Sequence, residues 1–136
     1  MSLTASIALA VTLALNGASG ATAPAQMPSA QTIQQYVEIY FADTPVMIDI
    51  AKCESRYRQF GTDGSVFRGV VNTKDVGVMQ INEFYHGKTA DKLGLDLYSI
   101  QGNVAYARYL YNKEGTAPWA SSSPCWDKIA GKIARK

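Results

Sequence analysis

The chain contains two cysteines, Cys53 and Cys125, and this pair is the feature that most constrains its fold. In an oxidising compartment they would form a disulfide that ties the end of the chain to its middle. Closing so long a loop would stabilise the fold by about 4 kcal/mol in the chain-entropy account. In a reducing compartment the same residues would be two buried thiols. Whether the two cysteines form a disulfide therefore depends on the compartment in which the protein is located.

The N-terminal segment indicates export. Residues 5–15 form an uncharged apolar run, and residues 21–23 (ATA) follow as the small-residue pattern of a signal cleavage site. The run is too short to span a membrane. No Lys or Arg precedes it, so only the α-amino group supplies the usual positive charge. We interpret residues 1–23 as a signal peptide rather than a buried helix, and expect a secreted or periplasmic protein with one disulfide.

Length and charge narrow the function classes. Removal of 23 residues from 136 would leave 113 (136 minus 23), which is one domain, and we expect a monomer. The net charge of +2 is too small to indicate nucleic-acid binding. The basic C-terminal residues would form a solvated helix end or tail, or lie near anionic wall polymers. One histidine and two cysteines are too few for a zinc site, so we expect no metal.

The pattern of apolar residues predicts a mostly helical α+β domain with a small β-hairpin or loop region. Residues 24–31 contain two prolines and no charge, which is typical of a linker, and residues 32–136 would form the domain. The helices are expected at about residues 32–43, 45–56, 89–93 and 99–114. A hairpin or extended loop is expected at residues 66–71, and residues 118–126 should wrap back over the helices.

Glu54 is the strongest catalytic candidate that the residue pattern offers. It follows Met47, Ile50 and Ala51 at offsets of seven, four and three, so it shares their inward face on the expected helix. Burial disfavours a charged carboxyl and should raise the pKa of Glu54 toward the range in which it donates a proton near neutral pH. The alternative is an ordinary, partly exposed glutamate at a helix end.

Two further polar residues lie at positions where spacing alone leaves two readings. Asn103 shares the inward side of its helix with Ile100 and Ala107, so it is either a core amide or a ligand for a sugar. Gln80 belongs to a segment that contains Gly77, which predicts either a close approach of the backbone or a tight turn. The many aromatic residues of the second half could stack on sugars or pack in the core.

Taken in order, these residues resemble the catalytic domain of soluble lytic transglycosylases. The small single-domain members, their relatives in secretion systems and the goose-type lysozymes are the most similar, and the resemblance covers roughly residues 33–126. The residues that carry it are Glu54 with Ser55 at a helix end, residues 77–82 (GVMQIN), and Asn103 and Val104 followed by Tyr106, Tyr109 and Leu110.

The resemblance implies a lysozyme-like fold and a peptidoglycan substrate. Members of the family cleave between N-acetylmuramic acid and N-acetylglucosamine without water, leave a 1,6-anhydro end, and need no metal or cofactor. Glu54 matches their single catalytic acid/base. The implied substrate-binding residues are Ser55, Met79, Gln80, Asn103, Tyr106 and Tyr109. The resemblance also implies wall remodelling, or a role beside secretion or division machinery.

Departures from the family pattern leave alternatives open. Goose-type lysozymes often carry Asp where this chain has Asn82, and this difference favours a lyase over a hydrolase. Asp63, Asp75 and Glu83 remain candidate second acids, with Asp75 the best of them unless it is only a turn or capping residue. The alternatives are therefore a lysozyme-type glycosidase that hydrolyses the same bond, or an inactive glycan-binding module.

Overall fold

The computed structural model describes residues 30–133. The expected signal peptide and most of the expected linker lie outside the described residues. The described part is mostly helical, with a small antiparallel sheet and one disulfide, which confirms the expected α+β class. In chain order the elements are α1 (Ala30–Tyr40), α2 (Pro45–Ser55), β1 (Asp75–Val76), β2 (Ile81–Asn82), α3 (Glu83–Lys92), α4 (Ile100–Glu114), η1 (Ala117–Ser122) and α5 (Ser123–Ile133).

The turn between α1 and α2 is fixed by a residue from a distant helix. α1 begins two residues inside the expected linker, and α2 begins with Pro45 at its first position, where proline fits a helix. The Arg108 guanidinium of α4 donates hydrogen bonds of 2.6 Å to both Thr44 Oγ1 and Asp43 Oδ1. These contacts hold the start of α2 against α4.

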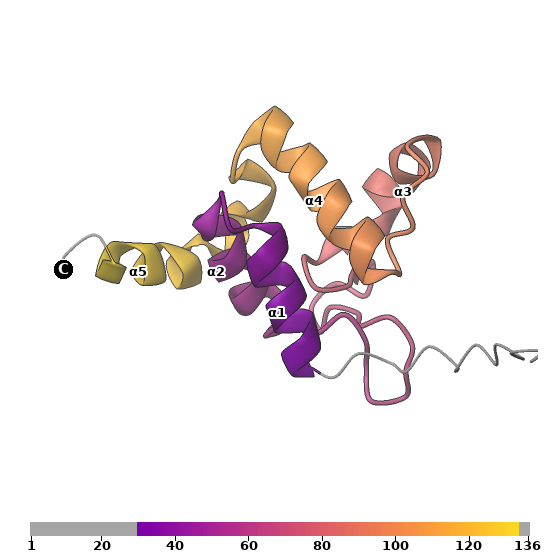
Figure 1. The fold of residues 1–136 in the computed structure, drawn as a ribbon. Coiled ribbons are helices and arrows are strands. Elements are labelled where there is room, and N and C mark those ends of the chain that lie inside the picture. The colour runs from indigo at the N-terminus through magenta and orange to yellow at the C-terminus, as the bar shows by residue number, and fades with distance from the viewer. Residues whose placement is uncertain (1–29, 134–136) are drawn as a thin grey trace, which may run out of the picture.

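The core lies between α4 and the first two helices. Figure 1 shows α4 crossing the middle of the molecule, with α3 and α5 on opposite sides. The core residues are completely or almost completely buried, and they come from the helices and from the small sheet. They include Val37 and Phe41, Met47 and Ile50 of α2, Val76 and Ile81 of the sheet, and Val104, Ala107 and Leu110 of α4.

Of the two alternatives expected at residues 66–71, a hairpin and an extended loop, the structure shows the extended loop. The paired strands are β1 and β2, with Val76 opposite Ile81, whereas residues 66–71 form an extended loop with isolated bridges. Val70 and Val71 are 92% and 102% exposed, so their β-prone side chains have no apolar surface to pack against. The small sheet instead forms where both partners can be buried.

α3 starts earlier than the expected helix at residues 89–93. Its N-cap is Asn82, whose side-chain oxygen accepts hydrogen bonds from the backbone N–H groups of Phe84 at 3.1 Å and Tyr85 at 3.3 Å. Phe84 and Tyr85 are mostly exposed, so the first turn of α3 shows no inward apolar stripe in the sequence.

The C-terminal tail wraps back over the helices, as expected, and is itself helical. It forms η1 and α5, and it buries Trp119 and Trp126 to 3% and 7% exposure. α5 packs on α2, and the disulfide between Cys53 and Cys125 joins these two helices across a sequence separation of 72 residues. The predicted pairing of the two cysteines is confirmed.

Loss of the disulfide should lower stability without changing the fold. The double substitution Cys53→Ala and Cys125→Ala is expected to reduce the free energy of unfolding by about 4 kcal/mol, because the unfolded chain regains the entropy of a long loop. Urea denaturation at equilibrium measures this change, with unreduced wild type beside reduced wild type as a control. An unchanged denaturation midpoint would contradict the prediction.

Candidate active site

Glu54 occupies the last turn of α2, where the helix meets the C-terminal tail. Loss of solvation by burial raises the pKa of its carboxyl above the usual range. A hydrogen bond from Ser122 acts in the opposite direction, and the negative charge of Asp75 adds to the rise. Glu54 therefore holds its proton to a higher pH than an ordinary surface glutamate does, which is the property that a proton donor needs.

The hydroxyl of Ser122 connects Glu54 to the buried tryptophans of the tail. Ser122 Oγ donates to Glu54 Oε1 at 2.6 Å and lies 3.1 Å from the backbone oxygen of Trp119. The Trp126 indole N–H donates at 3.1 Å both to Ser122 Oγ and to that same oxygen. Because one hydroxyl can donate to either acceptor, Ser122 can accommodate Glu54 with or without its proton.

Two cavities meet at Glu54. The smaller, of about 120 Å³, extends along His86, Leu110 and Trp119. The larger, of about 450 Å³, extends along Arg58, Phe67 and the loop at residues 69–72. The residues that line both cavities are Glu54, Asp75, Gln80 and Ser121. We call the two cavities together the cleft, and Glu54 lies where its two halves join.

Asp75 is the second carboxyl of the cleft. It begins β1, directly opposite Asn82 in the sheet register, and its Oδ1 accepts a hydrogen bond of 2.7 Å from Asn82 Nδ2. Asp75 lines both halves of the cleft, and its charge contributes to the raised pKa of Glu54. The structure thus brings together the two carboxyls that the sequence analysis ranked highest.

Buried side chains hold the segment at residues 76–79 beneath the cleft. Asn103 accepts a hydrogen bond from the Met79 N–H at 2.9 Å and donates to Val76 O at 3.0 Å and Leu97 O at 2.9 Å. Asn103 is completely buried, so the structure gives it the contacts of a core amide. This amide fixes the backbone that leads to Gln80.

Three other side chains complete this hold. Gln59 accepts from the Val78 N–H at 2.9 Å, and the Trp119 indole donates to Met79 O at 2.9 Å. Ser55 donates to Val78 O at 2.8 Å. Ser55 and Met79 are both buried, so they lie under the cleft, whereas Gln80 lines it.

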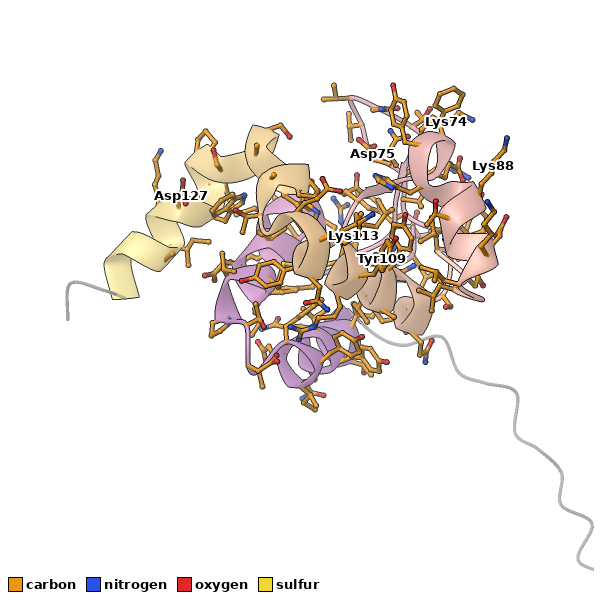
Figure 2. All side chains as sticks on the ribbon, turned by 90° about the horizontal axis from the view of Figure 1, so that it is seen from above. Lys74, Asp75, Lys88, Tyr109, Lys113 and Asp127 are labelled. Atoms are coloured by element: carbon orange, nitrogen blue, oxygen red, sulfur yellow. A yellow bond between two sulfur atoms is a disulfide. The ribbon has the colours of Figure 1, made fainter. Side chains whose placement is uncertain are left out.

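The two tyrosines of α4 differ in their surroundings. Tyr106 is 1% exposed, and its hydroxyl lies 3.0 Å from Nδ1 of His86, which lines the smaller half of the cleft. Tyr109 packs against Tyr106, and it projects from α4 together with Lys113 (Figure 2). The buried Tyr106 therefore holds the His86 ring in position through its hydroxyl and its ring contact.

Sequence reasoning missed Ser122, Gln59 and Arg58. Ser122 lies in a run of serines and prolines that reads as a loop, and its partner Glu54 is 68 residues away. Gln59 and Arg58 follow directly after α2, where the sequence gives no periodic signal. Glycine was the one usable clue, since Gly77 has a φ of +73° and a side chain there would collide with Gln59 and Asn103.

Comparisons with protein families, curated proteins and solved structures found no match for this chain. No helix within residues 30–133 is long and apolar enough to cross a membrane. In the same part of the chain, no cluster of three or more His, Cys, Asp and Glu side chains is arranged to hold a metal ion.

Replacing the buried amide should destabilise the fold. Asn103→Leu leaves the Met79 N–H without its partner and removes a donor from the backbone oxygens of Val76 and Leu97, so we expect a loss of about 3 kcal/mol or more. Asn112→Leu, at an exposed position of the same helix, should change stability by less than about 0.5 kcal/mol. Urea denaturation compares them, and equal losses would contradict the prediction.

Removal of the Ser122 hydroxyl should raise the pKa of Glu54 further. Ser122→Ala deletes the hydrogen bond that favours the carboxylate, whereas burial and the charge of Asp75 remain. Carbon-13 NMR titration of the Glu54 carboxyl measures this pKa directly. Ser122→Thr keeps a hydroxyl and should restore the wild-type value, and Ser123→Ala should leave it unchanged. A pKa that falls or stays constant in Ser122→Ala would contradict the assignment.

Proposed function

We propose that this chain is a lytic transglycosylase of lysozyme-like fold that cleaves peptidoglycan glycan strands, with Glu54 as its acid/base. The observation that carries the proposal is a carboxyl of raised pKa at the junction of the two halves of one cleft. A polysaccharide occupies sites on both sides of the bond that is cut. The position of Glu54 at this junction supports the proposal, because a glycan lying along the cleft would pass the carboxyl in mid-chain.

One carboxyl suffices for the proposed reaction. Protonated Glu54 gives its proton to the glycosidic oxygen between N-acetylmuramic acid and N-acetylglucosamine, and the bond from that oxygen to the anomeric carbon breaks. The 6-hydroxyl of the muramoyl sugar forms a new bond to the same carbon. The Glu54 carboxylate takes the proton of this hydroxyl, which closes the 1,6-anhydro ring and restores the acid.

Ser122 has the hydrogen-bonding capacity to follow both proton transfers. When Glu54 is a carboxylate, the Ser122 hydroxyl donates to it over the observed 2.6 Å. When Glu54 is protonated on its other oxygen, the hydroxyl can keep donating to Oε1 or turn to Trp119 O at 3.1 Å, and the acid proton stays available for the substrate. In this proposal Ser122 positions the Glu54 carboxyl and does not itself touch the substrate.

A lysozyme-type hydrolase is the second candidate, and Asp75 is the observation that favours it. Asp75 lines both halves of the cleft beside Glu54, so its carboxylate could activate water or stabilise positive charge on the sugar. Both candidates fit an exported monomer that acts on the cell wall, in remodelling or beside secretion or division machinery. They differ in the chemical nature of the product end.

Digestion of purified peptidoglycan tests the function. Wild type should release fragments with 1,6-anhydro-muramoyl ends, identified by mass spectrometry, and Glu54→Gln should reduce their rate of release about a thousandfold because the acid/base is lost. Glu38→Gln, an exposed substitution on α1 with the same change in charge, should leave the rate unchanged.

Other outcomes separate the alternatives. Reducing ends in place of anhydro ends would establish the hydrolase, and Asp75→Asn would then be expected to abolish turnover. Binding of glycan without turnover on walls of several types would overturn both enzymatic proposals and favour a binding module.

A further inference from the structure

We propose that Arg58 forms a carboxylate-binding subsite in the larger half of the cleft and selects glycans whose sugars carry a carboxylate. The inference rests on the proposed function and deepens it, because it names the chemical feature that the cleft would recognise. It starts from a surface arginine that is held by three contacts yet has no ionic partner within residues 30–133.

The backbone that leads to Arg58 is strained. Arg56 and Tyr57 follow α2 with φ angles of +55° and +60°, in the left-handed region that residues other than glycine rarely occupy. Such conformations cost free energy and persist where the surrounding structure imposes them, often at functional sites. This turn ends α2 immediately after Glu54 and Ser55, so Arg58 and Glu54 both line the larger half of the cleft.

Three contacts then fix the residue itself. Its backbone N–H donates to Ser55 Oγ at 3.0 Å, and its Nε donates to Ser55 O at 2.8 Å. The guanidinium carbon lies 4.0 Å from the centre of the Phe67 ring, which also lines the larger half of the cleft. Binding a ligand would therefore cost little further side-chain entropy.

The terminal nitrogens of Arg58 are left for a ligand. Arg68 and Arg108 direct theirs to Glu83 and Asp43, at 2.7 and 2.6 Å. Arg58 makes no salt bridge within residues 30–133, and its Nη atoms donate no hydrogen bond to the protein there. A planar guanidinium with both Nη groups available matches the geometry of a carboxylate.

The distribution of charge in the cleft indicates which ligand group Arg58 would bind. Among the described residues that line its two halves, Arg58 is the one cation, and it lies in the half that does not contain His86. A guanidinium forms a charge-assisted, bidentate pair with a carboxylate, whereas a neutral sugar offers it only weaker hydroxyl and amide acceptors. In peptidoglycan this carboxylate comes either from the lactyl group of muramic acid or from its stem peptide.

Binding measurements on an inactive background test the subsite. In Glu54→Gln protein, isothermal titration calorimetry compares three glycans of equal length: peptide-free strands with lactyl carboxylates, strands with stem peptides, and neutral chitin oligosaccharide. Adding Arg58→Gln should weaken binding of at least one carboxylate-bearing glycan about tenfold or more and leave chitin unchanged. Arg58→Lys should restore only part of the loss, because lysine lacks the planar fork.

The matched control is Arg56→Gln. It removes the same charge at a position two residues before Arg58, from a side chain that does not line the cleft, and it should not change binding. A loss on peptide-free strands alone identifies the lactyl carboxylate, and a loss on peptide-bearing strands alone identifies the stem. Equal losses on chitin, equal losses with Arg56→Gln, or no loss on any glycan would overturn the subsite while leaving the proposed function intact. Failure of all three glycans to bind Glu54→Gln protein with Arg58 in place would overturn both.

Discussion

The cleft depends on the backbone of residues 76–79, which buried side chains hold in place. In an ordinary strand the peptide groups of Val78 and Met79 would pair with another strand, but here the side chains of Asn103, Gln59, Ser55 and Trp119 supply their partners. They come from three parts of the chain, namely the end of α2 with the turn after it, α4, and η1, so the segment is fixed only when these parts are assembled. Buried polar groups are costly unless satisfied, and no buried side-chain polar atom in the described residues lacks a partner.

The tail turns this scaffold into a candidate catalytic site. Trp119 bonds to Met79, and Ser122, one helical turn later, reaches Glu54. The disulfide then joins Cys125 to Cys53, the residue before Glu54, so the two backbone segments that carry Glu54 and Ser122 are covalently tied. A proton donor must be held accurately to be effective, and here a covalent link restrains both partners of the hydrogen bond.

The sequence predicted what periodicity and cysteine chemistry encode. The bounds of α2 and α4, the inward face of Glu54, and the pairing of Cys53 with Cys125 all follow from local patterns. The paired strands and the start of α3 did not, because they depend on which β-prone residues find a buried partner and on a cap by Asn82. Ser122 and Arg58 could not be placed at all, since their roles arise from tertiary neighbours. Whether Ser55 and Tyr106 also influence a substrate stays a prediction.

The environment of Glu54 reflects two opposing demands on one carboxyl. Because burial raises its pKa, the folded state binds the proton more tightly than the unfolded state, and this favours folding below the unfolded pKa. That contribution is lost as the pH rises through the folded pKa, where the buried group becomes a charge. In the proposed reaction the acid/base must occupy both states, so complete burial of Glu54 would oppose the step in which it acts as a carboxylate. The Ser122 hydroxyl stabilises the carboxylate while burial favours the acid, so the two act on the pKa of Glu54 in opposite directions, and burial has the larger effect.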